Sequence, residues 1–276
     1  MTPLRSLVDR ALAAAAAVAL AAAPAVAAAQ AALDHILARK SISIAIPTDF
    51  PPYGFLGKDS KPQGLDVDMA RLVASKLGVE LVLVPVTSPD RIPYLQARKA
   101  DLVISTLGRT PEREKAIDFT AAYSPFFHAV FGPKHLVVNT RADLAGRSIA
   151  VTRATLEDQA LTKLAPSGTD IRRFEDNDAT VAAFVAGRTQ LIATGASVAG
   201  NMKARNPTLD AQYKLLLEES PNFIGVAKGE DRLRTRVDGI IADARRSGEL
   251  DRLAAKWLGR PAGDLPRDVP NSVTRA

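Results

Sequence analysis

One stretch of the sequence places an arginine and two hydroxyl side chains where they would bind a carboxylate together. Residues 102–104 (LVI) have the length and β-branched content of a buried strand. Ser105 and Thr106 follow, and Thr110 begins a helix, since threonine is a good N-cap and the proline after it suits the first turn. Arg113 therefore lies in that first turn, where its guanidinium, the hydroxyls and free backbone N–H groups favour an anion. The alternative is an arginine on the solvated surface and a threonine that only caps the helix.

The elements predicted before this stretch alternate between strands and helices. Strands are expected at 41–46 and 79–86. Between them, apolar residues recur at helical spacing over 65–77, with Asp66 off the apolar face. Residues 47–55 are rich in proline and aromatics and predict a stiff loop beyond the first strand. This alternation is typical of a mostly parallel sheet.

A second series of strands and helices follows and predicts a second lobe. The chain is expected to cross between the lobes near Ala129 and near Phe223. Ligands bind beyond the carboxyl ends of parallel strands, so the expected ligand site is the cleft between the lobes. The second-lobe strands are predicted at 148–151, 170–174, 190–193 and 213–217. The predicted boundaries are 32–131 and 224–260 for the first lobe, 132–223 for the second, and 261–276 for a C-terminal tail.

The composition is that of a globular protein and excludes several kinds of chemistry. Of the 276 residues, 24% are charged and 47% are hydrophobic, which excludes a disordered chain. The absence of cysteine excludes disulfides, thiolate metal sites, cysteine nucleophiles and a lipid-anchored cysteine. The formal net charge of +6 raises nucleic acid as a partner, but the basic residues are scattered among acids without a basic run. A small anionic ligand explains the positive net charge better than nucleic acid does.

The N-terminus predicts export. Arg5 and Arg10 form a positive region, an apolar run fills 11–23, and small residues offer cleavage sites up to Ala31. These features predict a cleavable secretory signal peptide over residues 1–31, too short and wrongly flanked for a membrane span. The mature protein is therefore expected outside the cytoplasm, without a lipid anchor.

The order of these segments resembles the solute-binding proteins of polar amino acid ABC transporters. The resemblance implies an α/β, two-lobed type II periplasmic binding fold with two hinge crossings and an interlobe ligand cleft. It also implies a periplasmic monomer that delivers a small carboxylate or amino acid to a membrane permease, without a cofactor, a metal or a catalytic residue. The segments that carry it are PTDFPPYGF (47–55), GLDVDMARLVASKLG (64–78), ADLVISTLGRTPEREKAIDFT (100–120), SIAVTRATLEDQAL (148–161) and ELDRLAAKWLG (249–259).

The resemblance implies roles for individual residues around the opening stretch. Arg113 matches the arginine that binds the α-carboxylate of the ligand as a bidentate pair. Ser105 and Thr106 match the loop positions that assist it, and Gly108 stands where a hydroxyl residue is common. Thr155, at the start of a helix in the second lobe, matches a contact to the same carboxylate.

Other positions are implied to contact the rest of the ligand. Phe50 corresponds to the aromatic residue that covers the ligand, although Tyr53 or Phe55 would serve if the shorter loop shifts the match. Asp49 would face the ligand side chain, or would only form the turn before the prolines.

The segment VTSPDRIPYL (86–95) is similar to the glutamate/aspartate-binding branch of the family. Arg91 would then bind a side-chain carboxylate, beside Ser88, or would only decorate the first turn of a short helix.

One departure from the family concerns the amino group of the ligand. The family usually places an aspartate near position 195 to hold an ammonium, and this sequence has Gly195 there. The expected ligand is therefore a small polar or acidic amino acid of the glutamate/aspartate type, with a non-amino carboxylate as the alternative.

An enzyme on the same fold, similar to cyclohexadienyl dehydratase, is the competing class of function. It would need a carboxylic acid as proton donor, for which Glu157, Asp158 and Asp49 are the candidates. We expect a binding protein rather than an enzyme, because no nucleophile triad, metal-ligand spacing or phosphate loop is present in the sequence.

Overall fold

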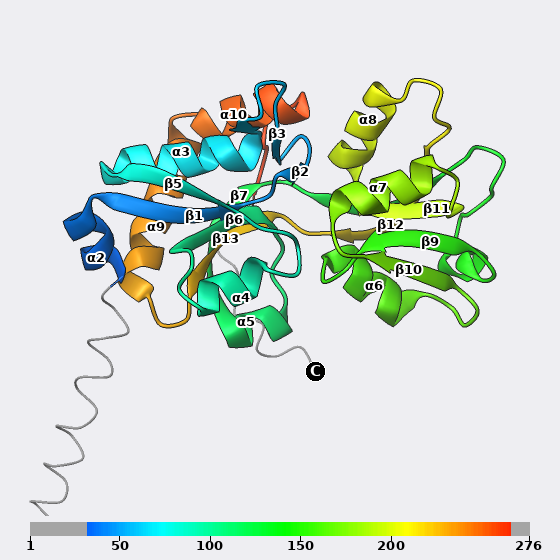
Figure 1. Ribbon diagram of the computed structural model, residues 1–276, viewed down its shortest axis with the longest axis horizontal. Helices are drawn as coiled ribbons and strands as arrows, with labels where there is room; N and C mark the ends of the chain where they lie inside the picture. Colours follow the sequence, from blue (N-terminus) through cyan, green and yellow to red (C-terminus); the bar gives the residue numbers. More distant parts are fainter. Residues whose placement is uncertain (1–31, 266–276) are drawn as a thin grey trace, which may run out of the picture.

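The computed structural model describes residues 32–265 and divides them into two lobes, each built around its own sheet (Figure 1). The predicted signal peptide and residues 266–276 of the predicted tail lie outside this range. Within it, no helix has both the length and the apolar character needed to span a membrane. The α/β class and the two-lobed arrangement predicted from the sequence are confirmed.

The sheet of the first lobe has five strands in the order β5-β1-β6-β13-β7. β1 pairs in parallel with β5 and β6, whereas β13 returns from the second lobe and runs antiparallel to β6 and β7. β7 was not predicted, because no glycine or proline separates it from the helix before it. The strand bounds are β1 Ser41–Ile46, β5 Glu80–Pro85, β6 Leu102–Leu107, β7 Ile117–Ser124 and β13 Asn222–Ala227.

Helices cover both faces of this sheet, so its central strands are apolar on both sides. Figure 1 shows α3 and α10 above the sheet and α4 and α5 below it. A small sheet, β2-β3-β4, lies next to α3 and carries the loop that was predicted to be stiff. The helix bounds are α2 Ala32–Arg39, α3 Leu65–Leu77, α4 Arg91–Gln96, α5 Pro111–Ala116, α9 Asp231–Arg246 and α10 Glu249–Leu258. The small strands are β2 Asp49–Phe50, β3 Gly54–Leu56 and β4 Pro62–Gln63.

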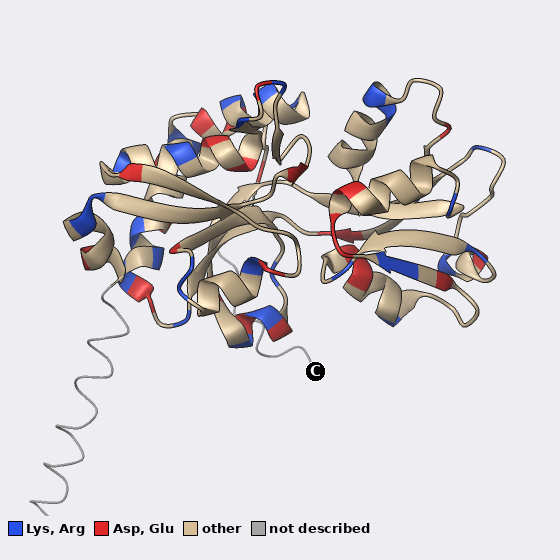
Figure 2. Cartoon of the chain, viewed as in Figure 1, with Lys and Arg blue, Asp and Glu red and all other residues tan. Residues whose placement is uncertain are grey.

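The sheet of the second lobe also has five strands, in the order β10-β9-β11-β8-β12. β9 pairs in parallel with β10 and β11, and β8 lies antiparallel between β11 and β12. In both lobes, Figure 2 shows basic and acidic residues interspersed over the helices. The strand bounds are β8 Phe127–Gly132, β9 Ser148–Thr152, β10 Asp170–Phe174, β11 Leu191–Gly195 and β12 Gln212–Glu219. The helix bounds are η1 Arg141–Leu144, α6 Leu156–Leu164, α7 Asn177–Val185 and α8 Ala196–Arg205.

The chain crosses between the lobes twice. It leaves the first sheet at the end of β7, at Ser124, and enters the second sheet with β8 at Phe127. It returns between Glu219 and Asn222. The predicted first boundary at residue 131 is therefore too late, because the run that was correctly expected to be a strand belongs to the second sheet. An apolar run shows that a strand is buried, but not which sheet contains it.

Candidate ligand-binding site

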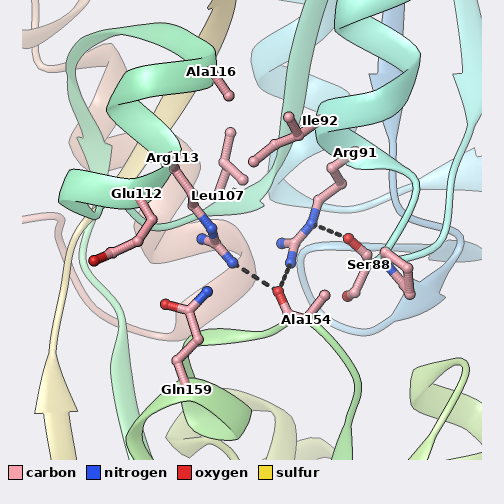
Figure 3. Close-up of a pocket in the computed structure, with 10 residues that line it drawn as sticks. Ser88, Arg91, Ile92, Leu107, Glu112, Arg113, Ala116, Ala154 and Gln159 are labelled. Atoms are coloured by element: carbon pink, nitrogen blue, oxygen red, sulfur yellow. Dashed lines mark hydrogen bonds between the residues drawn. The ribbon is translucent and has the colours of Figure 1, made fainter.

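Arg113 is a buried cation at the junction of the two lobes. It lies in the first turn of α5, where its backbone N–H donates to the Thr110 hydroxyl at 3.2 Å, so the predicted helix start is confirmed. Its guanidinium donates to the carbonyl of Gly108 at 2.7 Å and to the carbonyl of Ala154 at 2.8 Å. Because Ala154 belongs to the second lobe, Arg113 spans the junction (Figure 3).

Arg91 lies beside Arg113 and is held by more backbone carbonyls. Its guanidinium donates to Ser88 at 3.0 Å, to Ser105 at 2.9 Å, to Thr106 at 3.1 Å and to Ala154 at 3.5 Å. Arg91 therefore fixes the C-terminal end of β6 as well as contributing charge. Arg91 is thus more than a surface residue in the first turn of a short helix, and its contact with a ligand side chain stays a prediction.

Neither of these two arginines forms an ion pair with a carboxylate of the described residues. Across residues 32–265, every carboxylate oxygen lies more than 4.0 Å from the guanidinium nitrogens of Arg91 and Arg113, which is too far for an ion pair. Burial, followed by the charge of Arg91, lowers the pKa of Arg113 to about 9. Burial also lowers the pKa of Arg91, against the attraction of Glu157 and Asp49. An anion that entered this site would relieve both effects.

A cavity of about 260 Å³ opens beside the two guanidiniums. Its lining comes from α4 and α5 of the first lobe and from α6 and the loop before it in the second (Figure 3). Of the predicted ligand-binding residues, the cavity brings together Ser88, Arg91 and Arg113. The other lining residues are Pro89, Ile92, Leu107, Glu112, Ala116, Ala154 and Gln159.

The remaining predicted contacts around Arg113 lie next to this cavity rather than in its lining. Ser105 is buried, and Thr106 has a left-handed backbone (φ 43°) whose N–H donates to the carboxylate of Asp66 at 2.8 Å. A Cβ on Gly108 would lie 2.2 Å from the Leu156 side chain, which explains the absence of a hydroxyl residue there. The Thr155 hydroxyl accepts from Asp158 N–H at 3.2 Å and donates to a carbonyl, so it caps α6.

Asp49 contacts the other lobe. Its carboxylate accepts the backbone N–H of Asn177 at 2.7 Å and the Asn177 side-chain amide at 3.0 and 3.1 Å. Asn177 begins α7 in the second lobe, so this contact joins β2 to α7. Asp49 does not line the cavity described above.

Phe50 belongs to an aromatic cluster that also spans the junction. Its ring stacks on Tyr53, with 6.0 Å between centroids, and on Phe126, at 6.1 Å. Phe126 in turn packs against Gly195, where a Cβ would lie 2.3 Å from the Phe126 ring. An aspartate at position 195 would therefore require Phe126 to move.

Two buried acids near the junction make contacts that the sequence did not reveal. Asp66 was predicted to lie off the apolar face of its helix, yet it is fully buried and accepts the Tyr123 hydroxyl at 2.6 Å. Burial raises the pKa of Asp66 to about 6, although the Tyr123 and Thr106 hydrogen bonds oppose the rise.

Glu157 lies 3.0 Å from His128 Nδ1. Burial disfavours its charge, but the neighbouring His128 outweighs that cost and lowers the pKa of Glu157.

The functional group that the sequence missed most completely is the Ala154 carbonyl, because a backbone acceptor has no residue signature. Ala154 has a left-handed backbone (φ 61°), and its N–H donates to Asp158 at 3.1 Å. A non-glycine residue in this conformation is strained by about 1–3 kcal/mol and is found preferentially at functional sites. Within residues 32–265 no cluster of side chains suits a metal ion.

Known proteins with similar sequences are bacterial binding proteins. The chain is 27% identical to the L-cystine-binding protein of Escherichia coli (strain K12), over 82% of this chain and 86% of that protein. It is 26% identical to the L-arginine-binding protein of Pseudomonas aeruginosa, over 80% of this chain and 89% of that protein.

Solved structures show the same two-lobed architecture. A mutant of ArgBP from T. maritima superposes with a TM-score of 0.77 and 28% identity, over 83% of this chain and all of that one. An ancestral amino acid-binding protein, described as a precursor of cyclohexadienyl dehydratase, gives a TM-score of 0.75 and 29% identity over 82% and 98% of the two chains. The family model for bacterial extracellular solute-binding proteins, family 3, matches residues 42–260, and this chain belongs to that family.

Proposed function

We propose that this protein binds a small acidic molecule between its lobes, with Arg113 holding a carboxylate, and delivers it to the permease of an ABC importer. The candidate ligands are acidic amino acids of the glutamate/aspartate type and the related non-amino acids. The family binds amino acids, and the proposal specifies the chemical class of the ligand as a small acid. Its predicted location is the periplasm.

The observation that carries the proposal is the pair of buried guanidiniums without a carboxylate partner in residues 32–265. Arg113 is 6% exposed and Arg91 is 4% exposed, and both donate to the carbonyl of Ala154 across the junction. Buried charges are normally paired, because an unpaired charge in a medium of low dielectric is costly. A bound carboxylate would supply the missing partner and would favour the closed arrangement of the lobes.

The charge of the cavity argues against a basic ligand. Relatives in the family are named for L-cystine and L-arginine binding. An arginine side chain would bring a third guanidinium close to Arg91 and Arg113, and like charges at close range repel. An acidic ligand would instead be attracted by both.

The dehydratase alternative receives less support from the carboxylates near the junction. Glu157 is paired with His128, which lowers its pKa and makes it a weak proton donor at neutral pH. Asp158 pairs with Arg173 at 2.7 Å, and Asp49 accepts hydrogen bonds from Asn177. None of the three lines the cavity of Arg91 and Arg113.

Isothermal titration calorimetry tests the proposal. We expect the protein to bind at least one acid among glutamate, aspartate, glutarate and succinate. Arg113→Ala should lower that affinity by about 30-fold or more, since losing a buried charged hydrogen-bond partner costs about 2–5 kcal/mol. Arg113→Lys should recover part of the loss, because lysine keeps the charge but not the bidentate geometry.

Arg232→Ala is the matched control for loss of a positive charge. Arg232 lies on α9 of the same lobe and pairs with Asp34 at the surface, with its side chain 51% exposed. This variant should bind like the wild type. Binding of arginine or cystine in preference to every acid would overturn the proposal, as would an unchanged affinity in Arg113→Ala.

A further inference from the structure

The cavity presents donors for more than one carboxylate. Arg113 donates two hydrogen bonds and Arg91 four, out of the five N–H groups that each guanidinium carries. Arg113 therefore has the larger share of free donors. The Gln159 side chain points toward Arg113 from the second lobe, and Ser88 lies beside Arg91 (Figure 3). Two positive charges and neutral polar groups together favour a ligand with two negative charges.

Apart from the neutral Ser88 hydroxyl and Gln159 amide oxygen, the side chains of the same lining offer few acceptors for an ammonium group. Glu112 is the one acid in the lining of this cavity, and it is exposed. Its carboxylate accepts hydrogen bonds from its own backbone N–H and from the Thr110 hydroxyl, which lower its pKa. Figure 3 shows that this carboxylate points away from both guanidiniums.

The carbonyls that face the guanidiniums are also occupied. Gly108 accepts from Arg113, and Ala154 accepts from Arg113 and Arg91. An ammonium placed among these groups would meet two guanidiniums and acceptors that they already use. It would lose its hydration without gaining equivalent hydrogen bonds.

The acids just outside the cavity are already engaged by the protein itself. Asp49 accepts from Asn177, Glu157 is paired with His128, and Asp158 is paired with Arg173. Each of these carboxylates therefore already has a partner on a neighbouring element.

From these contacts we infer that the cavity takes a small dicarboxylate that carries no ammonium group. This inference rests on the proposed function and narrows its ligand class. A dicarboxylate would neutralise the two guanidiniums, whereas an acidic amino acid has a net charge of one and adds a cation. The cavity volume of about 260 Å³ lies below the range of about 300–1,000 Å³ for sites that take drug-sized ligands, which suits a short acid.

Two pairs of acids that differ by the ammonium group alone test the inference by calorimetry: glutarate against glutamate, and succinate against aspartate. The amine-free member of at least one pair should bind about tenfold more tightly or better, which is the usual cost of one unsatisfied polar group. Equal affinities in both pairs, or a preference for the amino acid, would overturn the inference and leave the proposed function standing. If none of the four acids binds, both fail.

Gln159→Glu provides a second test in a variant that should fold, because Gln159 is exposed on α6. The new carboxylate would face the guanidiniums, weaken dicarboxylate binding and supply an acceptor for an ammonium. The affinity ratio within each pair should therefore shift at least about threefold toward the amino acid. Gln159→Ala, which removes the amide without adding charge, should leave that ratio within about twofold of the wild type. A ratio that is the same in Gln159→Glu and in the wild type would contradict the inference.

Discussion

The two lobes contact each other through two polar regions that differ in their unused hydrogen-bonding capacity. In the arginine contact, Arg91 and Arg113 share the carbonyl of Ala154 and have no carboxylate partner among the described residues. In the aspartate contact, the Asp49 carboxylate accepts three hydrogen bonds, all from Asn177. The first contact has charge and donors left for a ligand, whereas the second is satisfied by the protein itself.

This difference separates recognition of the ligand from closure of the lobes. A charged residue near a cleft recognises a ligand only if the protein leaves it partly unsatisfied. By that criterion we propose that Arg113 serves to recognise the ligand, that Asp49 serves to hold the lobes together, and that Arg91 does some of each. Changes to these residues should therefore affect stability, affinity and selectivity in different proportions.

The largest expected effect on stability is that of Arg91→Met. The substitution keeps an apolar chain of similar length but leaves the carbonyls of Ser88, Ser105 and Thr106 without the donor they have now. We expect the free energy of unfolding to fall by about 3 kcal/mol, measured by urea denaturation. Arg113→Met should cost less, because Arg113 donates to two carbonyls whereas Arg91 donates to four. Equal losses for the two variants would show that both arginines serve mainly to stabilise the fold.

The next effect concerns the C-terminal end of β6, where Arg91 donates to the Thr106 carbonyl and Asp66 accepts the Thr106 N–H. Burial raises the pKa of Asp66 to about 6 from 3.8. A carboxyl with a higher pKa in the folded state binds more protons when folded. The favourable contribution of Asp66 to the free energy of unfolding is therefore complete below about pH 4, and it is lost as the pH rises through about 6.

We expect the stability of the wild type relative to Asp66→Asn to fall by on the order of 2–3 kcal/mol between pH 4 and pH 7. Urea denaturation of both proteins at several pH values measures this difference. Asparagine is the appropriate variant because it stays neutral and can still accept from the Thr106 N–H. Curves that remain parallel over this range would show that Asp66 does not titrate there.

The sequence predicted the arginine contact better than the aspartate contact, for a physical reason. The strand, loop and capped helix around Arg113 depend on neighbouring residues, so local signals were sufficient. The partner of Asp49 lies 128 residues away, and no local pattern indicates it. The burial of Asp66 was missed for the same reason, since Tyr123 lies 57 residues away.

Two further features of the site depend on groups that residue types do not reveal. The Ala154 carbonyl is a backbone atom whose direction depends on a left-handed conformation. The absence of an acid at Gly195 was noticed in the sequence, but the contact with Phe126 that accompanies it was not. Packing between distant segments explains both, and such packing is visible only in the folded chain.

Asp49→Ala gives the smallest expected effect on stability. It is also the sharpest test of the difference between the arginine contact and the aspartate contact. Removing the carboxylate leaves the Asn177 amide without its acceptor and weakens the closed arrangement by about 1 kcal/mol. Affinity should therefore fall by about three- to tenfold for every ligand alike, because a less populated closed state lowers all apparent affinities by the same factor. Small-angle X-ray scattering should show a larger radius of gyration than that of the wild type without ligand. The double variant with Asn177→Ala should add little, since both substitutions remove one contact.

The affinity ratio between glutarate and glutamate distinguishes this role from direct recognition. If Asp49 holds the lobes and does not contact the ligand, the ratio in Asp49→Ala should stay within about twofold of the wild type. If Asp49 faces the ligand, as one interpretation of the sequence predicted, removing its charge should change the ratio, because glutamate carries an ammonium and glutarate does not. A shift toward glutarate would move Asp49 from the closure contact to the recognition site, and the contrast between the two contacts would no longer hold.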